Sequence, residues 1–385
     1  MSATAELLFP AFTAVVAAGA LAMIVYIYAT ARRLADVPPA PEGMGPRVSI
    51  IVAARDEERH IRGAVAALLG QDYHDVELIV VDDRSRDRTS GILDTMAAKT
   101  ERLEVVHVRE LPAGWLGKNH ALHVGAQRAT GELLLFIDGD IMLHRSAVSR
   151  AVRVFDEPGA DHVTVSPQMD LPSWPLQLAV GYFLTWGVVV TRVWRVENPR
   201  SSAFIGIGAF NMVRATSYRA VGGHARIPMR PDDDLMLGKM LKRSGAQTRV
   251  LFGLGMVGVE WYRSLREATQ GFRKNAFAAL HYNVLVFAIA AAANLAIGVG
   301  PFVGLLWSSG AARVLYGIAV SALLAGYART AAAQKLPLWL ALLYPLAAIL
   351  QTGMLVIAVS RTIIAGGIDW RGTFYPLDQL KANRV

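Results

Sequence analysis

The chain has 385 residues, of which 53% are hydrophobic and 18% charged, a composition too apolar for a wholly water-soluble protein. Its net charge of +8 could suit nucleic acid, but the sequence has no RNA-binding signature and no stripe of interleaved aromatic and basic residues, so we expect no nucleic-acid partner. The absence of cysteine excludes disulfides and thiolate metal sites, which leaves oxygen and histidine ligands for any metal.

The first apolar stretch, Leu7–Ala31, contains no charged residue and is long enough to span a bilayer, which takes about 20 helical residues. Arg32 and Arg33 follow it rather than precede it, which favours an uncleaved anchor at residues 7–31 over a signal peptide. The positive-inside rule then places the following residues in the cytoplasm. We therefore expect a protein of the cell inner membrane with a cytoplasmic catalytic domain.

A linker rich in proline and glycine, residues 32–47, precedes a region in which strand and helix patterns alternate. The expected strands are Val48–Ala53, Glu77–Val81, Leu103–Val108 and Leu133–Ile137, and the helices between and after them are Glu57–Leu69, Thr89–Lys99, His120–Ala129 and Ser146–Phe155. This alternation predicts an α/β domain, residues 48–275, with a mostly parallel sheet between helices. Ligands bind such sheets beyond the carboxyl ends of the strands.

Acidic residues follow the first two strands. Glu57 and Glu58 come after the first strand, and Asp82 and Asp83 stand at the end of the second. Helix capping would explain part of this pattern, because acidic side chains favour the first turn of a helix. It does not explain two adjacent aspartates at a strand end, where mutual repulsion calls for a bound cation or donor.

Asp138-Gly139-Asp140 follows the fourth strand. Two carboxylates separated by one small residue can both face a divalent cation, and glycine allows a close approach. Mg²⁺ or Mn²⁺ prefers few carboxylates together with phosphate oxygens, which suits a diphosphate donor. The sequence therefore predicts a divalent metal site at Asp138 and Asp140.

Further polar candidates lie in the second half of the domain. Asp232, Asp233 and Asp234 are consecutive, and their repulsion would be relieved by a cation or a raised pKa, as a general base requires. A solvated acidic helix start is the alternative interpretation. Gln270 and Arg273 lie three residues apart on one helix face, where Arg273 could clamp a diphosphate or contact the membrane surface.

Three more apolar stretches follow: Asn275–Ala312, the marginal Val314–Ala328, and Leu336–Ser360. We expect multi-pass membrane helices within residues 276–365 and a tail at residues 366–385. Three spans after one anchor would leave this basic tail outside, against the positive-inside rule. One stretch would then be re-entrant or interfacial, with Pro301 and Pro345 as candidate break points.

Taken together, these residues resemble the family 2 glycosyltransferases, whose nucleotide-binding α/β domain is termed GT-A, over roughly residues 47–275. The resemblance implies that Glu57 and Asp83 hold the nucleoside of a nucleotide-sugar. It further implies that Lys118 lies in the donor pocket. The same likeness assigns donor binding to Asp138 and metal binding to Asp138 and Asp140.

The resemblance extends to the acceptor half. Gly206–Asn211 looks like the acceptor loop of the family. One alignment of its acidic motif selects Asp234 as the catalytic base with Asp233 beside it, and an alignment shifted by two residues selects Asp232 instead. Trp174–Trp194 suits either an interfacial helix near a lipid acceptor or a buried domain helix.

Gln270 and Arg273 match the Gln-x-x-Arg-Trp motif of processive polysaccharide synthases and related lipid transferases, but Lys274 replaces the tryptophan. The closing segment Gly366–Tyr375 is similar to the tail of bacterial carotenoid- and sphingolipid-type glycosyltransferases. The resemblance thus implies an inverting enzyme that moves a sugar from a nucleotide donor, expected to be a UDP-sugar, to a lipid acceptor. A processive synthase and an idle nucleotide-sugar-binding protein are the alternatives.

Overall fold

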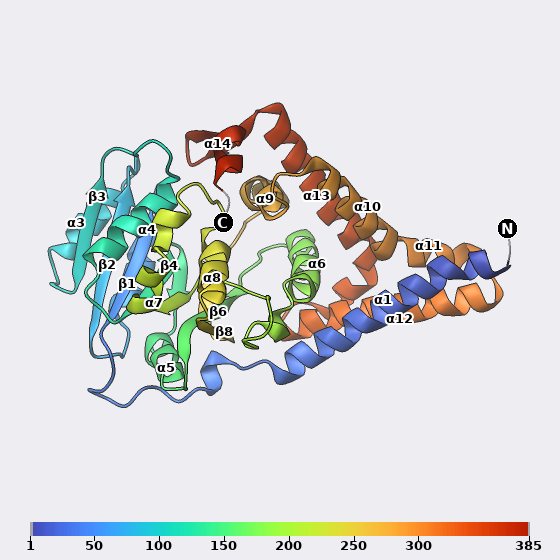
Figure 1. Cartoon of the computed structure of the whole chain (residues 1–385), viewed down its shortest axis with the longest axis horizontal. Helices are drawn as coiled ribbons and strands as arrows, with labels where there is room; N and C mark the ends of the chain where they lie inside the picture. Colours follow the sequence, from blue (N-terminus) through green and yellow to red (C-terminus); the bar gives the residue numbers. More distant parts are fainter. Residues whose placement is uncertain (1–2, 384–385) are drawn as a thin grey trace. The chain divides into compact units, whose positions relative to one another are not determined.

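A computed structural model of the chain describes residues 3–383. They form two compact units, each assembled from three segments of the chain (Figure 1). The helical unit comprises residues 3–31, 171–192 and 262–366, and the α/β unit comprises residues 32–170, 193–261 and 367–383. Every described strand belongs to the α/β unit.

The main sheet of the α/β unit has eight strands in the order β3-β2-β1-β4-β7-β6-β8-β5. Their bounds are β1 Val48–Ala54, β2 Val76–Asp83, β3 Leu103–Val108, β4 Leu133–Asp138, β5 Ile141–Leu143, β6 Ala160–Met169, β7 Asn211–Arg214 and β8 Gln247–Val259. The four strands expected from the sequence are confirmed and pair in parallel. The second half of the sheet is mixed, because β7 is antiparallel to both β4 and β6 and β5 is antiparallel to β8.

Helices cover both faces of this sheet, which explains why its strands are apolar at successive positions. On β1, Ile50 belongs to a core shared with helices α2 and α5, whereas Ile51 belongs to a core shared with α4 and α8. The helices of this unit are α2 Ile61–Leu69, α3 Thr89–Ala97, α4 Gly117–Arg128, α5 Ala147–Val154, α7 Ala215–Ala220, α8 Asp233–Arg243 and α14 Leu377–Ala382.

The predicted start of the first helix at Glu57 is wrong, because α2 begins at Ile61. Asp56 adopts a positive φ of 53°, which interrupts regular helix geometry. The Glu57 and Glu58 backbone amides donate to the side chains of Thr89 and Asp87, so acceptors from the segment after β2 satisfy these amides. Glu57 is consequently held in a loop beyond the carboxyl end of β1.

His162, on β6, is fully buried and links three strands of the sheet. Its Nε2 contacts Asn211 Oδ1 on β7, and its Nδ1 lies 3.1 Å from the Thr248 hydroxyl on β8. A neutral ring protonated on Nε2 satisfies both bonds, since the amide oxygen accepts and the hydroxyl donates. Burial lowers the pKa of His162 to about 4.

Acid should therefore destabilise the protein through His162. The unfolded chain takes up a proton below about pH 6.5 and the folded chain does not, so this stabilisation is complete above pH 6.5 and is lost towards pH 4. The slope is up to about 1.4 kcal/mol per pH unit. The thermal unfolding midpoint in detergent should fall between pH 7 and pH 5, and fall less in His162→Gln. Equal falls in both proteins would contradict this role.

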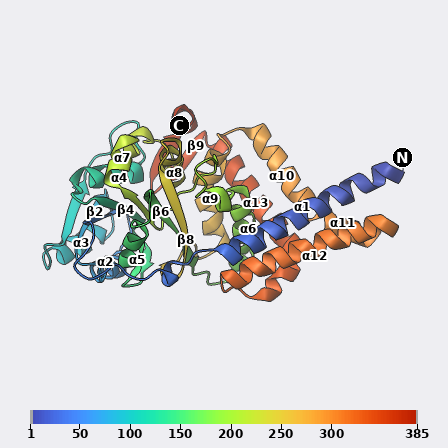
Figure 2. The same ribbon diagram turned by 60° about the horizontal axis from the view of Figure 1, so that its bottom comes forward.

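The helical unit contains the apolar stretches expected from the sequence, but its helices begin and end at other residues (Figure 2). Its helices are α1 Ala3–Thr30, α6 Trp174–Val190, α9 Leu265–Ala279, α10 Val284–Gly298, α11 Gly300–Trp307, α12 Gly310–Ala333 and α13 Tyr344–Ile364. In the described part of the chain, four segments are long and apolar enough to cross a membrane: Glu6–Thr30, Trp174–Arg195, Gly310–Ala333 and Leu338–Ile364.

The apolar stretch Asn275–Ala312 is divided among α9, α10, α11 and the start of α12. His281 and Tyr282 have positive φ values of 52° and 57° between α9 and α10, which are bent by 115°. Pro301 stands in the first turn of α11 and Pro345 in that of α13, so both are helix boundaries as expected.

The stretch Val314–Ala328 is longer as a helix than its uncharged core suggests, since α12 also includes Arg313 and Arg329. Helix α6 packs within the helical unit, where Trp186 Nε1 donates to the Tyr344 hydroxyl at 2.9 Å. Such bonds satisfy polar groups among largely apolar helices.

Candidate functional site

The candidate site lies in the α/β unit beyond the carboxyl ends of its parallel strands. Strand register places Ala53 of β1 beside Asp138 of β4 and Ala54 beside Asp82 of β2. The acidic residues that follow different strands are therefore brought to one edge of the sheet, as expected. The first turns of α4 and α8 add Lys118 and the consecutive aspartates to the same region.

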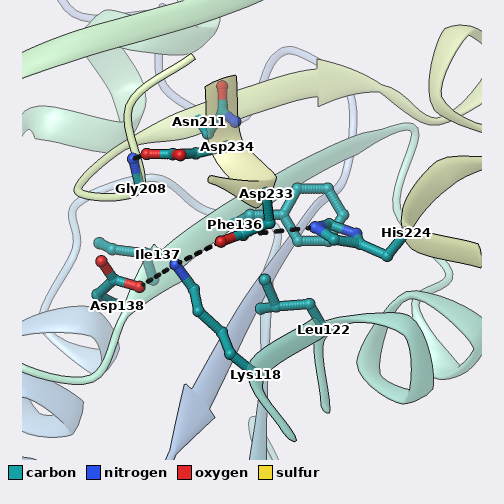
Figure 3. A pocket seen from close by; sticks show the side chains of 10 residues that line it. All are labelled: Lys118, Leu122, Phe136, Ile137, Asp138, Gly208, Asn211, His224, Asp233 and Asp234. Atoms are coloured by element: carbon teal, nitrogen blue, oxygen red, sulfur yellow. Dashed lines mark hydrogen bonds and ion pairs between the residues drawn. The ribbon is translucent and has the colours of Figure 1, made fainter. Parts of the chain in front are cut away.

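Lys118 is the centre of an ionic cluster (Figure 3). Its Nζ lies 2.8 Å from Asp138 Oδ1 and 3.3 Å from Asp233 Oδ1. Burial alone would lower the pKa of Lys118, but the charges of Asp138, Asp233 and Asp234 outweigh it and raise the pKa. Lys118 is thus a permanently charged group shared among three carboxylates.

Asp233 and Asp234 begin α8 and differ in exposure and partners. Asp233 is buried, 3.9 Å from His224 Nε2, whereas Asp234 is partly exposed in a small cavity. The cavity is lined by Lys118, Leu122, Phe136, Ile137, Asp138, Gly208, Asn211, His224, Asp233 and Asp234. Burial raises the pKa of both aspartates, and Lys118 opposes this effect. Raised pKa values of carboxylates suit proton acceptance near neutral pH.

Backbone contacts orient Asp234 within this cavity. The Gly208 amide donates to Asp234 Oδ2 at 2.7 Å, and the Leu235 amide donates to Oδ1 at 2.8 Å (Figure 3). The loop can approach α8 this closely because Gly206 has no side chain, since a Cβ there would lie 1.9 Å from the Asp234 carbonyl oxygen. The expected acceptor loop, Gly206–Asn211, is therefore in contact with Asp234.

Asp232 occupies a different environment from its two neighbours. It is buried and accepts two hydrogen bonds from Arg230, at 2.8 Å from Nε and 2.7 Å from Nη2. This bidentate pairing occupies both carboxylate oxygens. The cavity around Asp234 does not include Asp232 among its lining residues.

Asp138 and Asp140 are the two carboxylates expected to hold a divalent cation. Burial and, to a lesser degree, the charges of Asp138 and Glu57 raise the pKa of Asp140 to about 6, and the charge of Arg371 opposes this effect. Within residues 3–383, no group of three histidine or acidic side chains is arranged to hold a metal alone. Two carboxylates that need phosphate oxygens to complete coordination fit Mg²⁺ or Mn²⁺, although Asp138 would be shared with Lys118.

Asp83 and Asp82, which we expected to need a cation or a donor, find their partners within the chain. Arg84 donates to both oxygens of Asp83, at 2.7 and 3.0 Å, and Arg55 lies 3.6 Å from it. His107 stands opposite Asp82 on β3 and contacts it at 2.9 Å. The repulsion between the two aspartates is therefore relieved without a ligand.

Gln270 and Arg273 are on α9, in the helical unit, whereas the carboxylates belong to the α/β unit. The buried Arg273 Nε has no hydrogen-bond partner among the described residues. The side chain of Lys274 lies outside the described residues, as do residues 384 and 385 of the predicted tail.

Some residues of the site were not predicted. His224 is neutral and buried beside Asp233, and burial, Lys118 and His123 lower its pKa to about 3. Arg371 contacts Glu57, and Tyr375 contacts the start of α4. The sequence signal for the last two was the resemblance of their segment to tails of related enzymes, which carried no assigned role.

Comparisons with known proteins identify relatives of this chain. Residues 49–212 match the family described as "Glycosyl transferase family 2". The 4,4'-diaponeurosporenoate glycosyltransferase of Staphylococcus haemolyticus is 23% identical over 230 residues, 59% of this chain and 60% of that protein. The GalNAc(5)-diNAcBac-PP-undecaprenol beta-1,3-glucosyltransferase of Campylobacter jejuni is 28% identical over 118 residues, 31% of this chain and 37% of that protein. The chain thus matches less than two thirds of either relative's length.

A solved structure shares the fold over nearly the whole chain. The mannosyltransferase of Pyrobaculum calidifontis, in complex with GDP-Man and Mn²⁺, is 19% identical with a TM-score of 0.53. The match covers 93% of this chain and 99% of that one. The α/β unit therefore has the GT-A fold, and residues 49–212 form a family 2 glycosyltransferase domain.

Proposed function

We propose that the protein is an inverting hexosyltransferase that moves a sugar from a nucleoside diphosphate donor, a UDP-sugar, to a lipid acceptor in the membrane. The observation that carries this proposal is the position of Asp234. Its carboxylate is fixed by two backbone amides and faces a cavity that Lys118 and Asp138 also line. A proton acceptor thus stands beside groups suited to a diphosphate leaving group.

In the proposed reaction, Asp234 accepts the proton of the acceptor hydroxyl while that oxygen attacks the anomeric carbon. The bond between this carbon and the diphosphate oxygen breaks, and the nucleoside diphosphate leaves with the electron pair. A single displacement inverts the anomeric configuration. Asp233 keeps Lys118 and Asp234 in place, and its own ionisation is tied to theirs.

Donor binding is assigned to a second group of residues in the site. Glu57 and Asp83 hold the nucleoside, and Lys118 and Asp138 border the diphosphate. A divalent cation held by Asp138 and Asp140, Mg²⁺ or Mn²⁺, would neutralise the charge of the departing diphosphate. The Mn²⁺ complex of the mannosyltransferase and the negative charges of Asp138 and Glu57 near Asp140 support this assignment.

The lipid acceptor and the membrane location rest on separate support. The relatives are named for carotenoid and undecaprenol-linked substrates, and four described segments are apolar enough to cross a membrane. We accordingly propose a multi-pass inner-membrane protein with an anchor at 7–31, a linker at 32–47, a cytoplasmic catalytic domain at 48–275, membrane helices at 276–365 and a tail at 366–385. Gln270 and Arg273, which are on α9, would assist the departure of the diphosphate from the sugar.

The test uses full-length protein in nanodiscs with UDP-sugars, GDP-mannose and extracted membrane lipids. We expect release of nucleoside diphosphate and, by mass spectrometry, a lipid heavier by one hexose. Asp140→Asn should reduce transfer by about 100-fold or more, because it weakens the stabilisation of the leaving group. The fold should be retained, which unfolding measurements check. Unchanged turnover would remove Asp140 from the mechanism, and a ladder of products would indicate a processive synthase.

A further inference from the structure

The C-terminal segment of the α/β unit forms a two-stranded hairpin. Strand β9, Gly367–Trp370, pairs antiparallel with β10, Thr373–Pro376. Arg371 and Gly372 form the connecting turn with positive φ values of 51° and 73°. Such turns favour Asn-Gly, because a longer side chain at positive φ costs free energy. An arginine at the tip of this hairpin therefore needs another reason to be there.

Arg371 extends to the end of the sheet where the donor residues lie. Its guanidinium donates to Glu57 Oε1 and to the Arg55 carbonyl oxygen. The hairpin thus carries a cation to Glu57, beyond the carboxyl end of β1.

The guanidinium of Arg371 has capacity left for a ligand. A guanidinium presents five N–H donors, and the two contacts to Glu57 and Arg55 leave several of them available. The Arg371 side chain is 42% exposed, whereas that of Glu57 is 12% exposed. Glu57 therefore orients the guanidinium from the buried side, while part of it remains accessible.

Tyr375 brings the second strand of the hairpin against the nucleoside region. Its buried hydroxyl accepts a hydrogen bond from the Gly117 amide at 3.2 Å and also interacts with Arg84. A Cβ at Gly117 would lie 2.1 Å from Asp83 Oδ2, so Gly117 contacts Asp83 as well as Tyr375. Thr373 adds a contact with Arg55 at 3.4 Å.

We infer that this hairpin is part of the donor-binding site, in which Arg371 binds the diphosphate and Tyr375 forms a wall beside Asp83. The inference rests on the proposed function, because it presumes a nucleoside diphosphate donor. One planar guanidinium group can bind two phosphate oxygens at once. The positive charge of Arg371 also balances carboxylates that would otherwise repel a diphosphate. The strained turn is then explained by the position that it gives Arg371.

The experiment measures nucleotide binding by calorimetry to the full-length protein in nanodiscs with Mn²⁺. The probes are UDP, GDP, ADP, CDP and dTDP, each compared with its nucleoside. Arg371→Ala should weaken binding of the preferred diphosphate by about tenfold or more, since it removes hydrogen bonds to a charged group. Nucleoside binding should change less than about twofold, because the nucleoside lacks the phosphates that Arg371 contacts.

Three further variants complete the test. Arg371→Lys should recover part of the diphosphate affinity, and Tyr375→Phe should weaken nucleoside and diphosphate binding alike. Arg88→Ala is the matched control, because Arg88 is an exposed arginine that pairs with Glu58, next to Glu57, at 3.2 Å. Its binding should equal that of the unaltered protein.

The outcomes separate the hairpin from the proposed function. Unchanged diphosphate affinity in Arg371→Ala, or equal losses for diphosphate and nucleoside, would overturn the inference and leave a structural hairpin. If Arg371→Ala does not fold, Arg371→Lys decides by the same comparison. If the unaltered protein binds none of the five diphosphates, the proposed function fails, and the inference fails with it.

Discussion

Replacing Asp234 with asparagine is expected to lower kcat by about 100- to 10,000-fold, the range that a general base contributes. Asparagine has nearly the same shape and keeps an oxygen that can accept from Gly208, but it cannot take the acceptor proton. The Kd for nucleoside diphosphate should change little, because the substitution leaves Lys118 and Asp138 in place. Initial rates of nucleoside diphosphate release, with saturating donor and acceptor, measure this effect.

Asp232→Asn is the control for this prediction. Asp232 pairs with Arg230 and lies outside the cavity, so its replacement should lower stability more than kcat at a temperature where the protein stays folded. If Asp234→Asn retains more than about a tenth of the activity, Asp234 is not the catalytic base. A loss of turnover in Asp232→Asn alone would assign that role to Asp232 instead.

Replacing Lys118 with methionine should cause the largest loss of stability among the site residues. The side chain is 18% exposed and holds Asp138 and Asp233 together, so its removal leaves the buried Asp233 carboxylate without its counter-charge. Breaking such a pair costs about 3–5 kcal/mol. The free energy of unfolding at pH 7.5, measured in detergent, should fall by this amount.

The pH dependence identifies the cause of this loss. Without Lys118, the remaining carboxylates have pKa values raised further above those of the unfolded chain, so the folded state binds protons more readily. Stability from such groups is present at low pH and is lost as the pH rises. Lys118→Met should therefore regain part of its free energy of unfolding at pH 6. Lys118→Arg keeps the positive charge, so its stability should be lowered less at pH 7.5 and should rise less at pH 6. Equal losses at both pH values would point to packing instead.

Local sequence patterns predicted the first half of the sheet because each strand there is a continuous apolar run between turn residues. They also placed Asp82 and Asp138 at one edge of the sheet, since carboxyl ends of parallel strands share one edge, whereas Lys118 was assigned to this region by the family resemblance. The second half was missed because β7 has four residues and β6 contains Pro167, which weakens a strand pattern.

Contacts between distant residues were beyond prediction from local patterns. Arg371 and Glu57 are separated by 314 positions, and neither is surrounded by a pattern that points to the other. The pairing of Asp82 with His107 was more accessible, because the two stand opposite each other on neighbouring strands. A register argument for β2 and β3 would have supplied the partner that the adjacent aspartates required.

The returns of the chain to the α/β unit restrict how its helices can cross a bilayer. Residues 170 and 193 both belong to this unit. The strands before and after them, β6 and β7, share one sheet, which has to lie in a single compartment. Helix α6, which joins them, therefore cannot cross alone, despite its length and apolar composition. It must enter and leave through the same leaflet or remain within the protein.

The same reasoning applies to residues 262–366, because the chain rejoins the α/β unit at Gly367 and the hairpin contacts Glu57. Any helix of this segment that crosses the bilayer requires another that crosses back, and α12 and α13 both lie in segments long and apolar enough to cross. The basic tail then shares a compartment with the carboxylates of the candidate site, as the distribution of positive charge requires. The contact between Arg371 and Glu57 thus determines an even number of crossings after residue 262.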